Sequence, residues 1–552
     1  MAMQSLLLTC AFIVQAAVSL PTAETINGTY RGVHLPTWTQ DAFLGIPFAQ
    51  PPIGDLRFRW PQSLNESFAD VRNATEYGYS CMQFSDTPNE MSEDCLTLNV
   101  VRPSEETTYP LPVLVWIYGG GFTKGSTADP QYNLSGIVHV SQEIGQPVIA
   151  VSMNYRLNRY GFLHTPELLA EGSTNAGVLD QRLALRWIQE NIAAFGGDPS
   201  RVVLWGESAG AQSIAYHLFS YDGRDDGLFR GAILESGGPT GSQVQSLPYY
   251  KGFVQNMTRA VGCEEETDQL ACLRGLSQED LFAAVPHPDW RSSPIADGEF
   301  LTGYPSQLMP EGKFIKVPLL TGTNTDEGIS FHPDKPRLNT ETDLFHAFTS
   351  WREYSLSPPT IRKLLALYPD DPCTAPPFSI TNCSRLESPS GGPQWRRSAT
   401  IGGDLVMTAG RRKMCELYAT ASQPVWSYRF DQRLWNRSEE EGVQHFDNVA
   451  FSFQNISGLL GPEEYEAHAR LARVVGEAYI RFVNELDPNP RGDVLEETED
   501  AALNMPYWPK YGVETPVNLV FNASGIYLED DTYRKDGMDL INSPEVTREL
   551  LA

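Results

Sequence analysis

The sequence predicts an α/β fold with a large, mostly parallel central sheet and helices on both faces. Three apolar runs, at residues 112–118, 147–153 and 201–205, have the composition of buried strands. Residues 179–195 have helical periodicity and stop at Gly196-Gly197, a typical helix C-terminus. Strands that alternate with helices in this way form a mostly parallel sheet covered on both faces.

The first 19 residues are expected to be a signal peptide. Residues 6–14 form a short apolar core, and small residues follow through Ser19. The segment lacks the usual basic start; a membrane anchor, the alternative, is disfavoured because the run is short. No repeat or long linker divides the remainder, so residues 20–552 are expected to form a single domain of a secreted, extracellular protein.

The composition is strongly acidic, with 69 Asp and Glu against 41 Lys and Arg and a net charge of −28. Such a surface disfavours binding to nucleic acid and to anionic membranes. No stretch after residue 25 is apolar for long enough to cross a bilayer. We therefore expect no nucleic-acid partner, no stable membrane insertion and no obligate protein partner.

Cysteines and glycosylation motifs agree with secretion. The sequence has eight cysteines, and Cys10 lies in the predicted signal peptide. Six of the other seven fall into close pairs, which predicts the short-range disulfides Cys81–Cys95, Cys263–Cys272 and Cys373–Cys383. Cys415 is left over in a helix at residues 411–419 and is expected to be a buried thiol. Nine Asn-x-Ser/Thr motifs predict glycosylation at Asn27, Asn65, Asn73, Asn133, Asn256, Asn382, Asn436, Asn455 and Asn522.

The chemistry centres on Gly-Glu-Ser-Ala-Gly at residues 206–210. An apolar strand at residues 201–205 precedes it, and a helical pattern at residues 211–218 follows. Strand, sharp turn and helix around Gly-x-Ser-x-Gly form a nucleophile elbow, which lifts the Ser208 hydroxyl above the sheet edge. The alternative is a glycine-rich turn with an ordinary serine.

Further motifs give the chain a resemblance to the type-B carboxylesterase family, which includes cholinesterases, fungal lipases and many esterases on the α/β-hydrolase fold. The resemblance covers about residues 25–540, and residues 211–213 look more like fungal members. Its motifs are at residues 45–52, 93–100, 119–121, 154–156, 175–182, 195–199 and 206–210.

A serine nucleophile needs a base and an orienting acid, which in this fold follow in the order Ser, Asp or Glu, His. Only His445 and His468 follow residue 350; His468 lies in a helical pattern at residues 462–486 and is expected at its surface or boundary. His445, in a loop, is the expected base. Residues 322–328 resemble the family's acid motif, which implies Glu327 as the acid and leaves Asp326 to cap the following turn.

The resemblance also implies the groups around the triad. The oxyanion hole would be the backbone N–H groups of Gly120, Gly121 and Ala209. Many relatives have a supporting Glu three residues after the histidine, but this chain has Asn448 there. Glu207 is either a structural carboxylate or a group that tunes His445. The resemblance further implies that Arg57–Glu93 and Arg156–Asp180 are buried ion pairs; the alternative is that these pairs are exposed. It also implies a hydrogen bond from Ser236 near the triad.

The loop between Cys81 and Cys95 bears on the substrate. It contains no tryptophan, whereas the matching cholinesterase loop has one that holds choline, and it is too short and polar for the apolar lid of the fungal lipases. The sequence therefore predicts a serine carboxylic ester hydrolase that cleaves small to medium esters without a cofactor or metal. The alternatives are a lipase, an acyl-transfer enzyme on the same triad, and a non-catalytic cholinesterase-like binding module.

Overall fold

The computed structural model describes residues 20–105, 107–241, 243–283, 292–333, 337–378, 380, 383, 391–455, 465–490 and 504–551. The predicted signal peptide, residues 1–19, lies outside the described residues, and the division into signal peptide and single domain stays a prediction. Within the described part, no helix is both long enough and apolar enough to cross a membrane.

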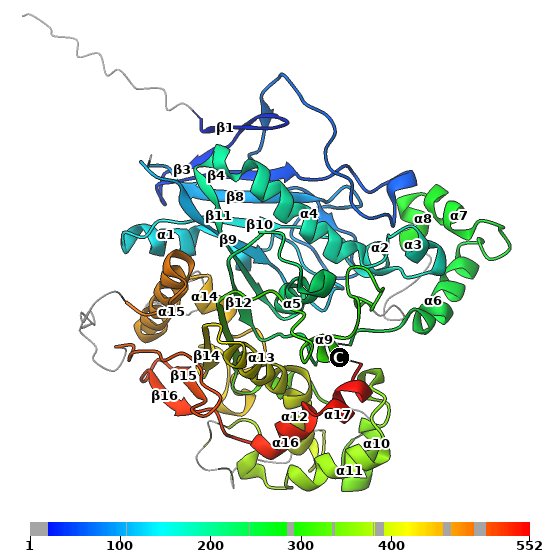
Figure 1. Cartoon of the computed structure of the whole chain (residues 1–552), viewed down its shortest axis with the longest axis vertical. Coiled ribbons are helices and arrows are strands. Elements are labelled where there is room, and N and C mark those ends of the chain that lie inside the picture. Colours follow the sequence, from blue (N-terminus) through cyan, green and yellow to red (C-terminus); the bar gives the residue numbers. More distant parts are fainter. Residues whose placement is uncertain are drawn as a thin grey trace, which may run out of the picture.

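An eleven-stranded sheet forms the centre of the molecule (Figure 1), in the order β16-β15-β14-β13-β12-β11-β9-β10-β8-β4-β3. In this order, the neighbouring strands from β15 to β10, which include β9, are parallel to one another. The pairs β16–β15, β10–β8, β8–β4 and β4–β3, towards the two edges, are antiparallel. Their bounds are β3 Val33–Leu35, β4 Gln40–Pro47, β8 Thr97–Pro103, β9 Leu111–Ile117, β10 Ile149–Met153, β11 Gly197–Glu207, β12 Gly231–Glu235, β13 Leu319–Asn324, β14 Val425–Phe430, β15 Val517–Phe521 and β16 Tyr527–Asp530.

The remaining strands are short. They are β1 Thr22–Thr25, β2 Gly28–Arg31, β5 Arg72–Asn73, β6 Ser80–Cys81 and β7 Met91–Ser92. The pair β6–β7 closes the base of the loop between Cys81 and Cys95.

Helices cover the sheet from both sides: Figure 1 shows α1 and α15 on one side of it and α4 and α5 on the other. The helices are α1 Ser135–Glu143, α2 Asn158–Phe162, α3 Pro166–Ala170, α4 Ala176–Asn191, α5 Ala209–Gly223, α6 Leu247–Ala260, α7 Gln269–Gly275, α8 Gln278–Ala283, α9 Pro305–Leu308, α10 Glu341–Phe348, α11 Pro358–Leu367, α12 Trp395–Gly403, α13 Ala409–Thr420, α14 Val449–Ser452, α15 Glu466–Glu485, α16 Lys535–Ile541 and α17 Pro544–Glu549. The predicted mostly parallel α/β sheet is confirmed.

Local sequence accounts for the elements that position the site. The strand β9 is buried at every residue, as its unbroken apolar run predicts for a parallel sheet. After α4, a 3-10 turn at Ile192–Phe195 ends at Gly196, whose φ of 87° is the left-handed conformation predicted for this C-terminus. In α13, Cys415 is buried, and burial raises the pKa of its thiol to about 12.

Candidate active site

Ser208 lies at the sharp turn between β11 and α5. Its φ of 55° and ψ of −123° form a strained conformation for a residue with a side chain. The turn packs so tightly that a Cβ at Gly210 would lie 2.0 Å from the carbonyl oxygen of Ile117. The Ser208 amide also donates to Glu235 O at 2.9 Å. The backbone therefore has the geometry of the predicted elbow at the carboxyl edge of the sheet.

His445 and Glu327 meet at this edge, although 118 residues separate them. His445 Nδ1 lies 2.7 Å from Glu327 Oε2. The other carboxylate oxygen accepts hydrogen bonds from Ser236 Oγ at 2.5 Å and from the Asn324 amide at 2.8 Å. Because the buried carboxylate accepts at Nδ1, the neutral imidazole carries its proton there and leaves Nε2 as the basic atom.

Asp326 does not cap the turn that follows it, so this expectation is wrong. Its side chain accepts hydrogen bonds from the backbone amides of Phe378 at 2.9 Å and Val443 at 2.8 Å. The Asp326 amide in turn donates to Val443 O at 2.9 Å. Glu327 is the first residue of the 3-10 helix η4, Glu327–Ile329. Asp326 therefore holds the loop that contains His445 next to the turn that contains Glu327.

Glu207 faces the basic side of the imidazole, with Oε1 3.2 Å from His445 Nε2. Burial raises the pKa of Glu207 to about 8, while the nearby His445 acts against that rise. Burial also opposes the imidazolium, but the carboxylates of Glu207 and Glu327 outweigh it and raise the pKa of His445 to about 9. This placement favours a tuning role for Glu207 over a purely structural one.

The turn after β9 presents two adjacent glycines beside Ser208. Gly120 and Gly121 have φ of 92° and 63°. Within the described part of the chain, no carbonyl or side chain accepts a hydrogen bond from either amide. The neighbouring Gly119 is so close that a Cβ on it would lie 2.9 Å from Ser208 Cβ. Ala209 begins α5, where the first N–H groups have no partner within the helix. These three amides are thus available to an oxyanion.

Sequence reasoning missed two polar residues near the predicted triad residues. Asn324, at the end of β13, donates to Asn448 Oδ1 at 3.0 Å and to Gln444 O at 2.8 Å. Glu235, at the end of β12, is fully buried and accepts from Tyr479 at 2.6 Å. Polar residues at the carboxyl ends of consecutive parallel strands were the available signal. His468 is buried in α15 and its Nε2 lies 2.9 Å from Gln432 Nε2, so the expected place at the helix surface or boundary is wrong.

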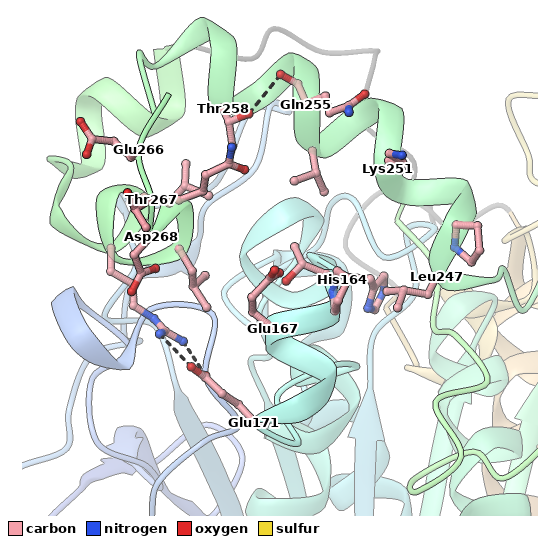
Figure 2. Close-up of a pocket in the computed structure, with 18 residues that line it drawn as sticks. His164, Glu167, Glu171, Leu247, Lys251, Gln255, Thr258, Glu266, Thr267 and Asp268 are labelled. Carbon is pink, nitrogen blue, oxygen red and sulfur yellow. Dashed lines mark hydrogen bonds and ion pairs between the residues drawn. The ribbon is translucent and has the colours of Figure 1, made fainter. Parts of the chain in front are cut away.

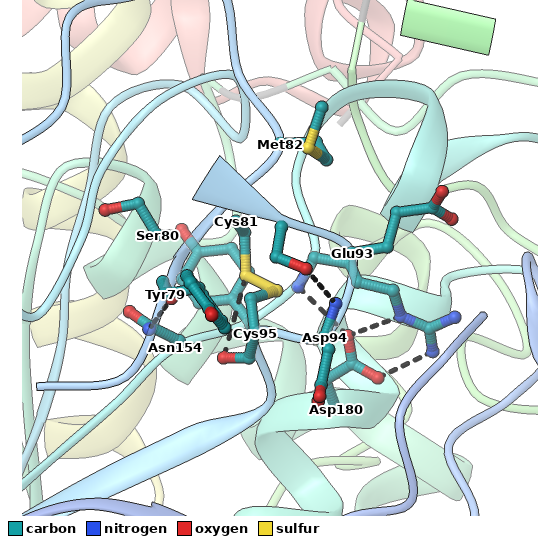
Figure 3. Close-up of a disulfide and its surroundings, with 12 residues drawn as sticks. Tyr79, Ser80, Cys81, Met82, Glu93, Asp94, Cys95, Asn154 and Asp180 are labelled. Atoms are coloured by element: carbon teal, nitrogen blue, oxygen red, sulfur yellow. Dashed lines mark hydrogen bonds and ion pairs between the residues drawn. A yellow bond between two sulfur atoms is a disulfide. The ribbon is translucent and has the colours of Figure 1, made fainter. Parts of the chain in front are cut away.

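The three predicted disulfides and the two predicted ion pairs are present in the structure. The structure joins Cys81 to Cys95 (Figure 3), Cys263 to Cys272, and Cys373 to Cys383. Both ion pairs are buried and bidentate, so the exposed alternative is wrong. The distances are 2.7 Å and 2.7 Å for Arg57–Glu93, and 2.8 Å and 2.6 Å for Arg156–Asp180.

The nine glycosylation motifs differ in exposure. Asn27 is buried, 8% exposed, and its amide donates to Glu66 O at 2.9 Å, which leaves little room for a glycan. Asn455 and Asn522 are half-buried, and Asn382 lies outside the described residues. The exposed asparagines are Asn65, Asn73, Asn133, Asn256 and Asn436.

The described structure also contains a cavity of about 860 Å³ (Figure 2). Its lining comes from α3, α6 and α7 and the segments beside them, and includes His164, Glu167, Lys251 and Arg274. None of the predicted catalytic residues lines it, so this cavity is not the predicted catalytic site.

Comparisons with known proteins agree with this geometry. The model of the carboxylesterase family matches residues 15–525. Secreted lipase 1 of Botryotinia fuckeliana (strain B05.10) is 34% identical, over 95% of this chain and 92% of the relative. The solved structure of Aspergillus niger EstA is 29% identical with a TM-score of 0.83, over 97% of this chain and 99% of EstA. A structure named PNB esterase is 30% identical with a TM-score of 0.75, over 95% of this chain and 100% of that structure. The chain therefore has the α/β-hydrolase fold, is a carboxylic ester hydrolase and belongs to the carboxylesterase family.

Proposed function

We propose that the protein hydrolyses small to medium carboxylic esters through Ser208, His445 and Glu327. The observation that supports this most is the 2.7 Å contact between His445 Nδ1 and the buried Glu327 carboxylate, at the same sheet edge as the strained Ser208 turn. A hydroxyl is a weak nucleophile until an oriented base removes its proton. Glu327 provides the orientation and stabilises the imidazolium.

The reaction has two halves. Ser208 Oγ bonds to the ester carbonyl carbon while His445 Nε2 takes the hydroxyl proton, and the carbonyl oxygen becomes an oxyanion. The bond to the alcohol oxygen then breaks, the alcohol takes the proton from Nε2, and the acyl group stays on Ser208. Water repeats the sequence with its proton passing to Nε2, and the acid leaves as Ser208 recovers its proton.

Gly120, Gly121 and Ala209 stabilise the charge in this scheme. Gly120 and Gly121 follow Gly119, where a Cβ would lie 2.9 Å from Ser208 Cβ, and no group of the described structure accepts a hydrogen bond from their amides. The Ala209 amide is at the start of α5. Donors that are already oriented require no reorganisation when the oxyanion forms. One such donor typically contributes about 3–4 kcal/mol of transition-state stabilisation.

The loop between Cys81 and Cys95 favours soluble esters over an oil–water interface. The loop is closed by β6 and β7, and Gln83 within it bonds to the main chain of Gly125. A lid that opens at an interface has to leave the body of the protein, whereas this loop is tied to it. Lipase activity is the second candidate, because Secreted lipase 1 is named a lipase.

Hydrolysis of p-nitrophenyl esters from acetate to palmitate, by wild type and Ser208→Ala, tests the proposal. We expect turnover of short esters that Ser208→Ala abolishes. A maximum at palmitate that rises in an emulsion would make the protein a lipase. No turnover of any ester by folded protein, with no labelling by an organophosphate, would favour a binding module.

We further propose that the protein is secreted after removal of residues 1–19 and that residues 20–552 act as one domain. Three disulfides and a relative named a secreted lipase support an oxidising, extracellular location. Exposed glycosylation motifs such as Asn73 and Asn256 support glycans on the surface. Mass spectrometry of the secreted protein would give both the mature N-terminus and the occupied asparagines.

A further inference from the structure

We propose that Gln83, in the loop between Cys81 and Cys95, and Asn158 are positioning residues for the oxyanion turn. This inference rests on the proposed function, because it takes Gly120 and Gly121 as oxyanion donors. Neither side chain was singled out by the sequence. Both are 2% exposed and place a side-chain amide between the two loops.

Gln83 pairs with the main chain of Gly125 as a neighbouring strand would. Its Nε2 donates to Gly125 O at 2.9 Å, and its Oε1 accepts from the Gly125 amide at 2.9 Å. Nε2 also donates to Cys81 O at 3.2 Å, inside its own loop. Every hydrogen bond of this amide is thus used to hold the position of Gly125 relative to the disulfide.

Asn158 makes the same connection from a third segment. Its Nδ2 donates to Thr123 O at 2.8 Å and to Met82 O at 3.2 Å, and its backbone amide donates to Phe122 O at 2.9 Å. Asn158 has φ of 53°, an uncommon conformation that such functional bonding can hold in place.

These contacts bear directly on the two glycines. The carbonyl of Gly120 accepts from the amides of Thr123 at 3.1 Å and Lys124 at 3.2 Å, which makes residues 120–124 one tight turn. Lys124 O is packed so closely that a Cβ at Gly120 would lie 2.2 Å from it. The turn is therefore held at Thr123 and Gly125, and a shift at either position moves the Gly120 and Gly121 amides.

Further hydrogen bonds connect the same two segments at a greater distance from the glycines. Ser80 Oγ donates to Ser126 Oγ at 2.8 Å, and Asn154 bonds to Tyr79 O at 3.0 Å and accepts from the Thr127 amide at 3.0 Å. Figure 3 shows Tyr79, Ser80 and Asn154 beside the Cys81–Cys95 disulfide. Residues 79–83 are thus bonded, directly or through Asn154 and Asn158, to the segment at residues 123–127.

Gln83→Met tests the inference, since methionine has a similar length and cannot make the paired hydrogen bonds. Displaced oxyanion donors weaken transition-state binding without weakening ground-state binding. With p-nitrophenyl acetate we expect kcat to fall on the order of 10- to 100-fold and KM to change less than twofold. The inhibition constant of a trifluoromethyl ketone, which forms a tetrahedral oxyanion on Ser208, should rise by the same factor as kcat falls.

Thr87→Val is the matched control. It removes a side-chain to main-chain hydrogen bond of the same loop, from Thr87 Oγ1 to Asn89 O at 2.6 Å, that stays inside the loop. Its kcat and inhibition constant should equal those of wild type. If Gln83→Met does not fold, Asn158→Asp, which loses the two donated hydrogen bonds at nearly equal size, is judged by the same two constants.

Folded Gln83→Met with wild-type kcat and inhibition constant would overturn the inference. A fall in thermal stability without a matching rise in the inhibition constant would also overturn it, because that is the signature of a structural role. Measuring Ser208→Ala in the same series distinguishes a failure of the proposed function from a failure of the positioning role. Activity that survives Ser208→Ala refutes the proposed function, whereas loss in Ser208→Ala with none in Gln83→Met refutes only the positioning role.

Discussion

Replacing Gly328 by alanine adds one methyl group where the turn bearing Glu327 rests on α12. A Cβ at Gly328 would lie 1.7 Å from the carbonyl oxygen of Ala399 and 3.0 Å from the amide nitrogen of Gly403. Both neighbours are backbone atoms of a helix, so no side chain can rotate away. The turn and α12 must therefore separate by roughly 1.5 Å to restore an ordinary contact distance.

That displacement acts on the proposed triad because Glu327 is the residue before Gly328. Its carboxylate must hold His445 Nδ1 at 2.7 Å while it accepts from Ser236 and Asn324. A misplacement of about 1 Å typically costs about 100-fold in rate. We expect kcat/KM of Gly328→Ala to fall by about that factor, and overpacking to lower the free energy of unfolding by about 1–3 kcal/mol.

The assay compares kcat/KM for p-nitrophenyl acetate and urea unfolding in wild type, Gly328→Ala and Gly252→Ala. Gly252 lies in α6, and apart from the helix's own backbone and the two neighbouring residues no atom lies within 4 Å of an added Cβ, so its alanine should leave activity unchanged. Helix propensity should even stabilise that variant, by about 0.5–1 kcal/mol. A folded Gly328→Ala protein with wild-type kcat/KM would refute the reasoning that this contact positions Glu327.

Two further variants address the charges on the imidazole. Glu207→Gln removes one of the two carboxylates that together raise the pKa of His445 to about 9, so the neutral base should form at lower pH. The acid limb of the kcat/KM profile between pH 5 and 10 should move down by about one unit or more, and a limb that stays in place would contradict the tuning role. Glu327→Gln keeps the size of the side chain but removes the charge that stabilises the imidazolium. Its kcat should fall by about 10⁴ with a similar KM in stopped-flow or steady-state assays, and a loss below tenfold would argue against Glu327 as the acid of the triad.

The buried strands and the elbow were predictable because their causes are local. An apolar run such as β9 is buried in any parallel sheet, and Gly-x-Ser-x-Gly between a strand and a helix encodes its own turn. Close cysteine pairs such as Cys81–Cys95 likewise follow from a short loop. His445 and Glu327 were chosen by chain order and family resemblance rather than by any local pattern.

What the sequence determined, then, is the strand–helix order, the elbow at Ser208 and the residue types of an ester hydrolase. Only the tertiary structure decided that Asp326 holds the loop of His445 instead of capping its own turn, that Glu207 faces the imidazole, and that Gln83 pairs with Gly125. Local periodicity and turn chemistry depend on neighbours along the chain, so the sequence displays them directly. The contacts of Gln83 with Gly125 and of Glu235 with Tyr479 join residues 42 and 244 positions apart. They depend on which strand ends and loops the sheet brings together, and no local pattern records that.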